Sequence, residues 1–241
     1  MRNKIKIKRG IEEQRKIYKV EIAKNSSILP GDLQGSPDES LILKDTLVFI
    51  DEAFLEKLSK HLGKGRYIKF DKVLFAKNLA KNQKLDCKDI FYYTAPPFQS
   101  DNPTKEEEKR RYGYDKFINN LKEKGIIVRE GRCQRLKIDG AFIFKQKAVD
   151  VLLAMDLTNV PIKYPNVKKI ILISSDSDFV PVLENLMTNG VKTILYTYYE
   201  KTRNTPFSRS NHLIKSVNKY VLLNENDFLN ALFKNGRKNE K

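Results

Sequence analysis

Cysteine and histidine are scarce in this 241-residue chain, which contains two residues of each type. Cys87 and Cys133 lie far apart in the sequence and belong to no CxxC or Cys/His pattern. We therefore expect two free buried thiols rather than a disulfide or a zinc site. Because only His61 and His212 are available, an imidazole-rich metal site is not expected either.

Long apolar runs are also missing. No stretch approaches the roughly 18 consecutive apolar residues of a membrane-spanning helix, and the basic start Met1–Arg9 lacks the apolar core of a signal peptide. The GxxxxGK[ST] motif is absent, which argues against a P-loop. Neither GxGxxG nor GxSxG occurs. Since 40% of the residues are hydrophobic, the chain can still bury a sizeable core. We expect a soluble, cytoplasmic protein without a membrane partner.

Positive charge is abundant. The net charge is +16 and the isoelectric point is near 9.6, more than solubility requires. Such a surplus favours a polyanionic partner, nucleic acid first, although lysine-rich surfaces also occur across whole proteomes of some organisms. Residues 1–24 alone contain nine Lys or Arg against three Glu. This segment is typical of a phosphate-binding tail or of a poorly ordered terminus.

Pro30, Gly31, Gly35 and Pro37 mark a linker before the main domain. We predict a basic N-terminal extension and linker over residues 1–40, a main domain over 41–224, and a C-terminal helix with a basic tail over 225–241. Within the main domain the patterns predict strands at 47–50, 89–94, 126–128, 170–173, 191–196 and 220–223, a hairpin at 132–144 around Asp139-Gly140, and helices at 71–83, 103–124, 145–160, 208–217 and 227–233. This alternation predicts a three-layer α/β/α fold with a mostly parallel central sheet.

Two apolar runs end abruptly in carboxylates. Ile170–Ile173 is followed by Asp176 and Asp178, and Leu47–Ile50 is followed by Asp51. Runs of this kind are typical of parallel strands buried on both faces, and ligands bind just past the carboxyl ends of such strands. Asp and Ser at these positions also cap helices routinely, so each acid taken singly has a structural explanation.

The helix predicted at 145–160 is apolar on most of its circumference, so we expect it to be deeply buried, and it bears Asp150 and Asp156. Six helical residues place these two side chains about 120° apart and about 9 Å apart along the axis, so both cannot bind one ion. Asp150 lies nearer the helix start, where the dipole favours an anion. Asp156 is expected to support the metal ligands without binding the ion itself, or to pair with a cation or a backbone amide.

Carboxylates from three segments thus meet at one edge of the predicted sheet. Crowded carboxylates repel one another, so such a cluster persists mainly where a divalent cation neutralises it. Oxygen-only ligands suit Mg²⁺ or Mn²⁺. Together with the basic surface, the site predicts phosphodiester hydrolysis, with Asp51, Asp150, Asp176 and Asp178 as catalytic metal ligands.

The motifs KAVDVLLAMD (147–156), ILISSDSDF (171–179) and GVK (190–192) resemble the signature of NYN domains, the LabA/DUF88-type branch of the PIN-like nucleases. Phe49–Asp51 resembles the first motif of that family, and residues 210–220 are similar to its closing helix and strand. The resemblance covers roughly Leu41 to Leu223. It implies a PIN-like fold and metal-dependent endoribonuclease chemistry, with the same four aspartates at the matching positions.

The chain departs from the family at Glu52 and Phe54, where the family usually carries Gly and Asn, and at Asn218, where Asp is common. The alternative is therefore an RNA-binding or scaffold protein that keeps the fold with weak or no nuclease activity. Asp176–Val180 also fits the DxDx(T/V) motif of haloacid dehalogenase-type phosphatases, but that motif normally precedes most of its domain, and here only residues 181–241 follow.

The remaining expectations concern supporting and RNA-binding residues. Residues expected to support the ligands are Glu52, Asp156, Ser174 and Ser175. Residues expected to contact RNA, single-stranded or structured, are Lys147, Arg203, Arg209 and Lys215. Tyr196, Tyr198 and Tyr199 are candidates for stacking on bases, although an alternating Tyr strand is more often packing. A homodimer is also compatible with the sequence.

Overall fold

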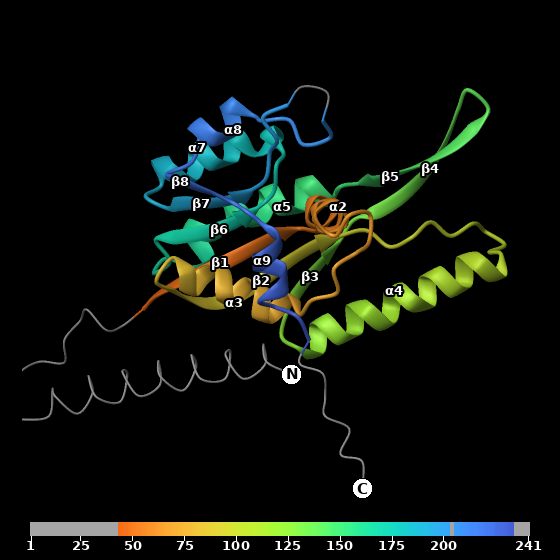
Figure 1. The fold of residues 1–241 in the computed structure, drawn as a ribbon, viewed down its shortest axis with the longest axis horizontal. Coiled ribbons are helices and arrows are strands. Elements are labelled where there is room, and N and C mark those ends of the chain that lie inside the picture. Colours follow the sequence, from red (N-terminus) through yellow and green to blue (C-terminus); the bar gives the residue numbers. More distant parts are fainter. Residues whose placement is uncertain (1–42, 203–204, 234–241) are drawn as a thin grey trace, which may run out of the picture. The chain divides into compact units, whose positions relative to one another are not determined.

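A six-stranded parallel sheet forms the centre of the fold in the computed structural model, which describes residues 43–202 and 205–233 (Figure 1). Its strands in chain order are β1 (Lys44–Asp51), β2 (Leu85–Thr94), β3 (Ile127–Glu130), β6 (Lys169–Ile173), β7 (Lys192–Thr197) and β8 (Lys219–Leu222). In space the order is β3-β2-β1-β6-β7-β8, with every neighbouring pair parallel. The helices are α2 (Glu52–Leu62), α3 (Lys72–Asn82), α4 (Lys105–Glu123), α5 (Val149–Thr158), α6 (Val160–Lys163), α7 (Val180–Thr188), α8 (Asn211–Lys215) and α9 (Glu225–Leu229).

Helices cover both faces of this sheet, which confirms the predicted three-layer α/β/α fold. Side chains alternate between the faces along each strand, and the apolar runs supply a core to each. On one face Val48 and Ile50 of β1 pack with residues of α2, α3, α4 and α9. On the other face Leu47 and Phe49 pack with residues of α5, α6, α7 and α8. Burial of each such side chain contributes about 1.5–3 kcal/mol.

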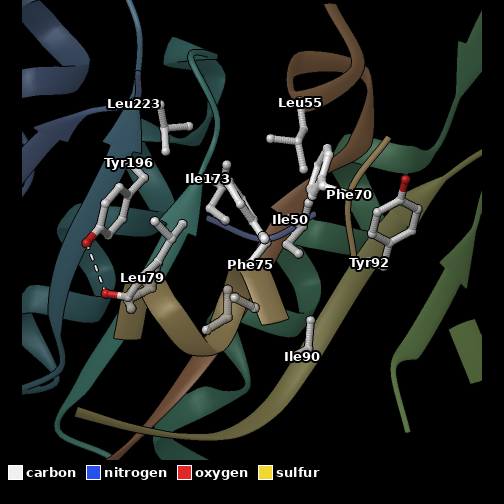
Figure 2. Packing of buried hydrophobic residues seen from close by; sticks show 14 of the residues in the cluster. Ile50, Leu55, Phe70, Phe75, Leu79, Ile90, Tyr92, Ile173, Tyr196 and Leu223 are labelled. Carbon is white, nitrogen blue, oxygen red and sulfur yellow. Dashed lines mark hydrogen bonds between the residues drawn. The ribbon is translucent and has the colours of Figure 1, made fainter. Parts of the chain in front are cut away.

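Figure 2 shows the first of these cores, in which Ile50 and Ile173 from the sheet meet Leu55 of α2 and Phe75 of α3. Tyr196 of β7 lies in the same core with only 1% of its surface exposed, and its hydroxyl donates a hydrogen bond to the carbonyl oxygen of Leu79 over 3.0 Å. Tyr196 therefore has a packing role and cannot stack on a base.

The helix predicted at 145–160 differs from the observed one in its start and in its burial. Lys145–Lys147 belong to a strand, and Ala148 has a φ of 67°, in the left-handed region, before α5 begins at Val149. α5 buries only the stripe Val149, Leu153 and Leu157, so the expectation of a deeply buried helix is wrong. The sequence is apolar around the helix, but the sheet covers just one side of it.

An antiparallel hairpin forms a second, two-stranded sheet: β4 (Arg132–Ile138) and β5 (Ala141–Lys147). The predicted turn at Asp139-Gly140 is present, with positive φ at both residues. Figure 1 shows this hairpin extending beyond the central sheet.

The last two helices have bounds that differ from the predicted ones because of their capping residues. Ser210 accepts a hydrogen bond from the backbone N–H of Leu213, so α8 occupies residues 211–215 rather than 208–217. Asn224 and Asp227 form a capping box, so α9 begins at Glu225 and ends at Leu229.

Cys87 and Cys133 are free thiols, as expected, but each is half-buried rather than buried. Within the described part of the chain, none of the helices combines the length and the apolar character needed to cross a membrane. The extension predicted at residues 1–40 lies outside the described residues, and the predicted domain boundaries stay predictions.

Candidate active site

The sheet reverses its direction of growth between β1 and β6. From β1 the chain adds β2 and β3 on one side, whereas β6, β7 and β8 follow on the other side. Such a topological switch point leaves a crevice past the carboxyl ends of the two strands, where ligands of open α/β sheets bind. Asp51 ends β1, and Ser174 and Asp176 follow β6 directly. Both acidic segments of the sequence therefore reach this point.

Asp51 is the most buried acid of the site, with 8% of its surface exposed. Its Oδ2 accepts a hydrogen bond from the hydroxyl of Ser174 over 2.9 Å, and its Oδ1 accepts one from the backbone N–H of Phe54 over 3.3 Å. Burial, and to a lesser extent the charges of Asp150 and Asp176, raise the pKa of Asp51 to about 6 despite these donors. Asp51 is thus a helix cap, as its structural interpretation predicted, and also a charge coupled to two other acids.

Asp150, Asp176 and Asp178 complete the group. Burial first, and then the charges of Asp176 and Asp178, raise the pKa of Asp150. Asp176 is half-buried and its Oδ1 accepts a hydrogen bond from the backbone N–H of Asp178 over 2.9 Å, which caps the 3₁₀ turn η2 (Ser177–Phe179) before α7. The four predicted aspartates from β1, α5 and the β6–α7 loop therefore act on one another electrostatically.

The donor set fits a hard divalent cation in type. Carboxylate oxygens, without Cys or His, are the ligands that Mg²⁺ and Mn²⁺ prefer, and Mg²⁺ commonly keeps several waters while one or two carboxylates bind it. Among residues 43–202 and 205–233, no three acidic, His or Cys side chains lie close enough together to form a ready-made metal cage. The carboxylates past the ends of β1 and β6, which we call the acidic crevice, thus match such an ion in ligand type but do not surround it as a cage.

Asp156 points away from this crevice, as the helical spacing predicted. Its Oδ2 accepts hydrogen bonds from Nε of Arg129 over 2.9 Å and from the hydroxyl of Tyr93 over 3.0 Å. Tyr93 stands opposite Asp51 in the register of β1 and β2, so the bonds from Tyr93 and Arg129 tie α5 to two strands of the sheet. Asp156 therefore fixes the helix that presents Asp150.

Glu52 and Phe54 follow Asp51 but face elsewhere. Burial raises the pKa of Glu52, the neighbouring Glu56 raises it further, and the charge of Lys72 lowers it, whereas Asp51 has the weakest of these effects. The Phe54 ring lies in the core beneath α2. The family Asn position is thus apolar core here, and support of the site by Glu52 stays a prediction.

The two serines after β6 have different surroundings. Ser174 is fully buried and also receives a hydrogen bond from the backbone N–H of Asp176, which links both acidic segments through one hydroxyl. Ser175 lines a small pocket together with Thr197, Tyr199, Ser208 and Ser210. Ser174 is therefore the serine that contacts the acids directly.

Three of the residues predicted to contact RNA, Lys147, Arg209 and Lys215, lie on the surface. Lys147 ends β5, three residues before Asp150, and Lys215 ends α8; Lys147 is exposed, and the Arg209 guanidinium lies 5.2 Å from the centre of the Tyr199 ring. Arg203 lies outside the described residues. Contact of these residues with RNA stays a prediction.

Sequence reasoning missed an aromatic cluster on the β4–β5 hairpin. Arg135 lies 4.7 Å from the ring centres of both Phe98 and Phe142, and the Phe98 and Phe144 rings are 5.6 Å apart. The two-residue turn at Asp139-Gly140 contained the signal, because it sets the register that places Arg135 opposite Phe144.

Comparison with known proteins agrees with this architecture. The family model of the NYN domain matches residues 45–223. The crystal structure of a protein of unknown function from Vibrio parahaemolyticus has a similar fold, with a TM-score of 0.50, 19% sequence identity, and coverage of 77% of this chain and 96% of that one. A search of curated proteins found no match. Because the family model matches most of its length, the chain belongs to the NYN domain family of the PIN-like superfamily.

Proposed function

We propose that this protein is a metal-dependent endoribonuclease that hydrolyses RNA phosphodiester bonds at the acidic crevice between β1 and β6. The observation that carries the proposal is the convergence of Asp51 and Asp176, which the Ser174 hydroxyl links by hydrogen bonds, with Asp150 near enough to raise the pKa of Asp51. Membership of the NYN family supports a nuclease-like function, and the net charge of +16 suits a polyanionic substrate.

Each side chain has a definite part in this proposal. Of Asp51, Asp150, Asp176 and Asp178, one or two would bind Mg²⁺ or Mn²⁺ directly and the others through its waters, and the ion when bound would supply charge neutralisation and a more acidic water. The Ser174 hydroxyl orients Oδ2 of Asp51 and thereby leaves one carboxylate fixed before substrate arrives. Asp156, held by Arg129, keeps α5 and hence Asp150 in place. A preorganised carboxylate avoids a reorganisation cost during the reaction.

The direct test is cleavage of a single-stranded RNA by the purified full chain with Mn²⁺ or Mg²⁺. We expect products with 5′-phosphate ends, and loss of cleavage on addition of EDTA. Asp51→Asn and Asp176→Asn should each abolish cleavage. Asp45→Asn is the matched control, since Asp45 lies near the opposite end of the same strand and should leave activity unchanged. Wild-type activity in both site variants would refute the assignment of the acidic crevice as the active site.

An RNA-binding or scaffold role without turnover is the second candidate. The observation that favours it is the Phe54 ring, which lies in the core at the position where the family usually carries Asn. It predicts RNA binding that does not depend on divalent metal and is unchanged in Asp51→Asn and Asp176→Asn. Isothermal titration with Mn²⁺ separates the two: the nuclease proposal requires metal binding that both substitutions weaken.

A further inference from the structure

The β4–β5 hairpin, residues Arg132–Lys147, forms a projection that we call the arm. It contains five Lys or Arg against one Asp, a net charge of +4. Every residue of β5 is exposed, and the two strands pair with each other rather than with the central sheet. Figure 1 shows the arm leaving the domain near α5 and reaching past the sheet. Neither its charge nor its apolar residues are needed for the two cores of the domain.

One face of the arm combines rings and cations. Cross-strand pairing places Arg135 opposite Phe144 and Lys137 opposite Phe142, so these four side chains share a face. Phe142 is 57% exposed and Phe144 is 51% exposed. Phe98, from the segment after β2, packs against Phe144 and Arg135 from the side. These two aromatic rings are about half exposed and lie beside cationic side chains. Such an arrangement is unusual in a structural hairpin and typical of a binding surface.

The base of the arm is fixed to the end of β2 and to the start of α5. The backbone N–H of Gly131 donates to the carbonyl oxygen of Thr94 over 2.9 Å, at the end of β2. A Cβ on Gly131 would lie 2.4 Å from the carbonyl oxygen of Lys147, so only glycine fits where the two strands leave the domain. At the other strand, Lys147 and Ala148 lead directly into α5 and Asp150. The arm therefore ends three residues before Asp150.

We propose that the arm binds single-stranded RNA, with bases stacked on Phe142 and Phe144 and phosphates against Arg135, Lys137 and Lys147. The inference rests on the proposed function, because it names the surface that would hold the RNA for the acidic crevice. Rings accept the face of any base, and flanking cations follow the backbone. Single-stranded RNA fits better than a duplex, whose deep and narrow major groove side chains cannot read.

A second copy of the chain is a poorer occupant of the same face. Two arms with a charge of +4 each would repel one another, and the Lys and Arg side chains on both strands discourage strand pairing between copies. RNA supplies the opposite charge along its whole length. Charge complementarity thus selects the nucleic acid.

The test is fluorescence anisotropy with a labelled single-stranded RNA, using the full chain in EDTA with Asp51→Asn as the background so that the RNA stays intact. We expect Phe142→Ala/Phe144→Ala to weaken binding at least about tenfold, as expected for the loss of base stacking. Tyr112→Ala/Tyr220→Ala is the matched control, since it removes two exposed rings from α4 and β8 and should leave the affinity unchanged. Circular dichroism of each variant checks that the fold is retained.

Charge is tested separately by the salt dependence of binding. Arg135→Gln/Lys137→Gln should reduce the slope of log affinity against log salt by about 0.7 for each phosphate that the variant no longer neutralises. The control Lys81→Gln/Lys192→Gln neutralises two exposed lysines elsewhere and should leave the slope as it is. Equal slopes in both double variants would overturn the binding of phosphates by Arg135 and Lys137.

Two outcomes overturn the proposal as a whole. One is wild-type affinity in Phe142→Ala/Phe144→Ala. The other is sedimentation in which that variant changes from dimer to monomer while its affinity for RNA is unchanged, because the arm would then be an interface between copies. Failure of the nuclease function looks different: the wild-type chain with Mn²⁺ would not cleave, yet binding would still depend on the arm. If the chain cleaves RNA but Phe142→Ala/Phe144→Ala changes neither the affinity for RNA nor KM, only the RNA-binding role of the arm is overturned.

Discussion

Asp51→Asn should make the metal-free protein more stable at neutral pH while it destroys the site. Burial raises the pKa of Asp51 from 3.8 to about 6, so the folded state holds this carboxylate ionised at a cost. The stability contributed by the protonated acid is fully present below pH 3.8 and is lost as the pH rises through about 6. The difference corresponds to about 3 kcal/mol above pH 7 and to about half of that near pH 5. Asn is nearly isosteric and carries no charge.

The assay is urea unfolding of wild type and Asp51→Asn in EDTA at pH 7.5 and pH 5. We expect the variant to be more stable by up to about 3 kcal/mol at pH 7.5, and the gain to shrink by roughly half at pH 5. Mn²⁺ should then stabilise the wild type but not the variant, since a ligand stabilises only the state that binds it. A gain independent of pH, or a variant less stable than wild type at pH 7.5, would refute the electrostatic account.

Three further substitutions test the surroundings of the site. Arg129→Met should lower the free energy of unfolding by about 1–3 kcal/mol, because it leaves the largely buried Asp156 without its cation; urea unfolding measures this, and an unchanged midpoint would contradict the ion pair. Tyr196→Phe should cost about 1 kcal/mol in the same measurement and leave RNA affinity unchanged, since the ring is buried; weaker RNA binding would contradict a purely structural role. Ala148→Gly should raise the melting temperature, because glycine accepts the left-handed φ of 67° without strain, and a lower melting temperature would show that this conformation is not strained.

The central strands could be predicted because their residues are continuously apolar. Ile170–Ile173 and Leu47–Ile50 are apolar without alternation, which is the pattern of a parallel strand covered on both faces, and both lie in the middle of the sheet. The place of Asp51 and Asp176 followed from the same runs, since parallel strands end at one edge. The spacing of Asp150 and Asp156 was likewise sufficient to separate their directions.

Features that depend on neighbours distant in the sequence could not be predicted. Nothing local shows that the Phe54 ring enters the core, or that Glu52 lies beside Lys72, twenty positions later. The apolar character of α5 does not reveal which stripe the sheet covers, so Val151 and Met155 are exposed although the sequence predicts a buried helix. The strand character of Lys145–Lys147 depends on its pairing with β4.

The hydrogen bond between Ser174 and Asp51 joins residues 123 positions apart in the chain. β1 is made early in synthesis, but the crevice between β1 and β6 can form only after β6 has been made. Contacts of such long range form late, after much of the loop entropy has been lost. A polypeptide that has not yet been extended past β6, or one that terminates before it, therefore cannot assemble the acidic crevice. If the finished protein cuts RNA, fragments that end before β6 are therefore expected to be inactive.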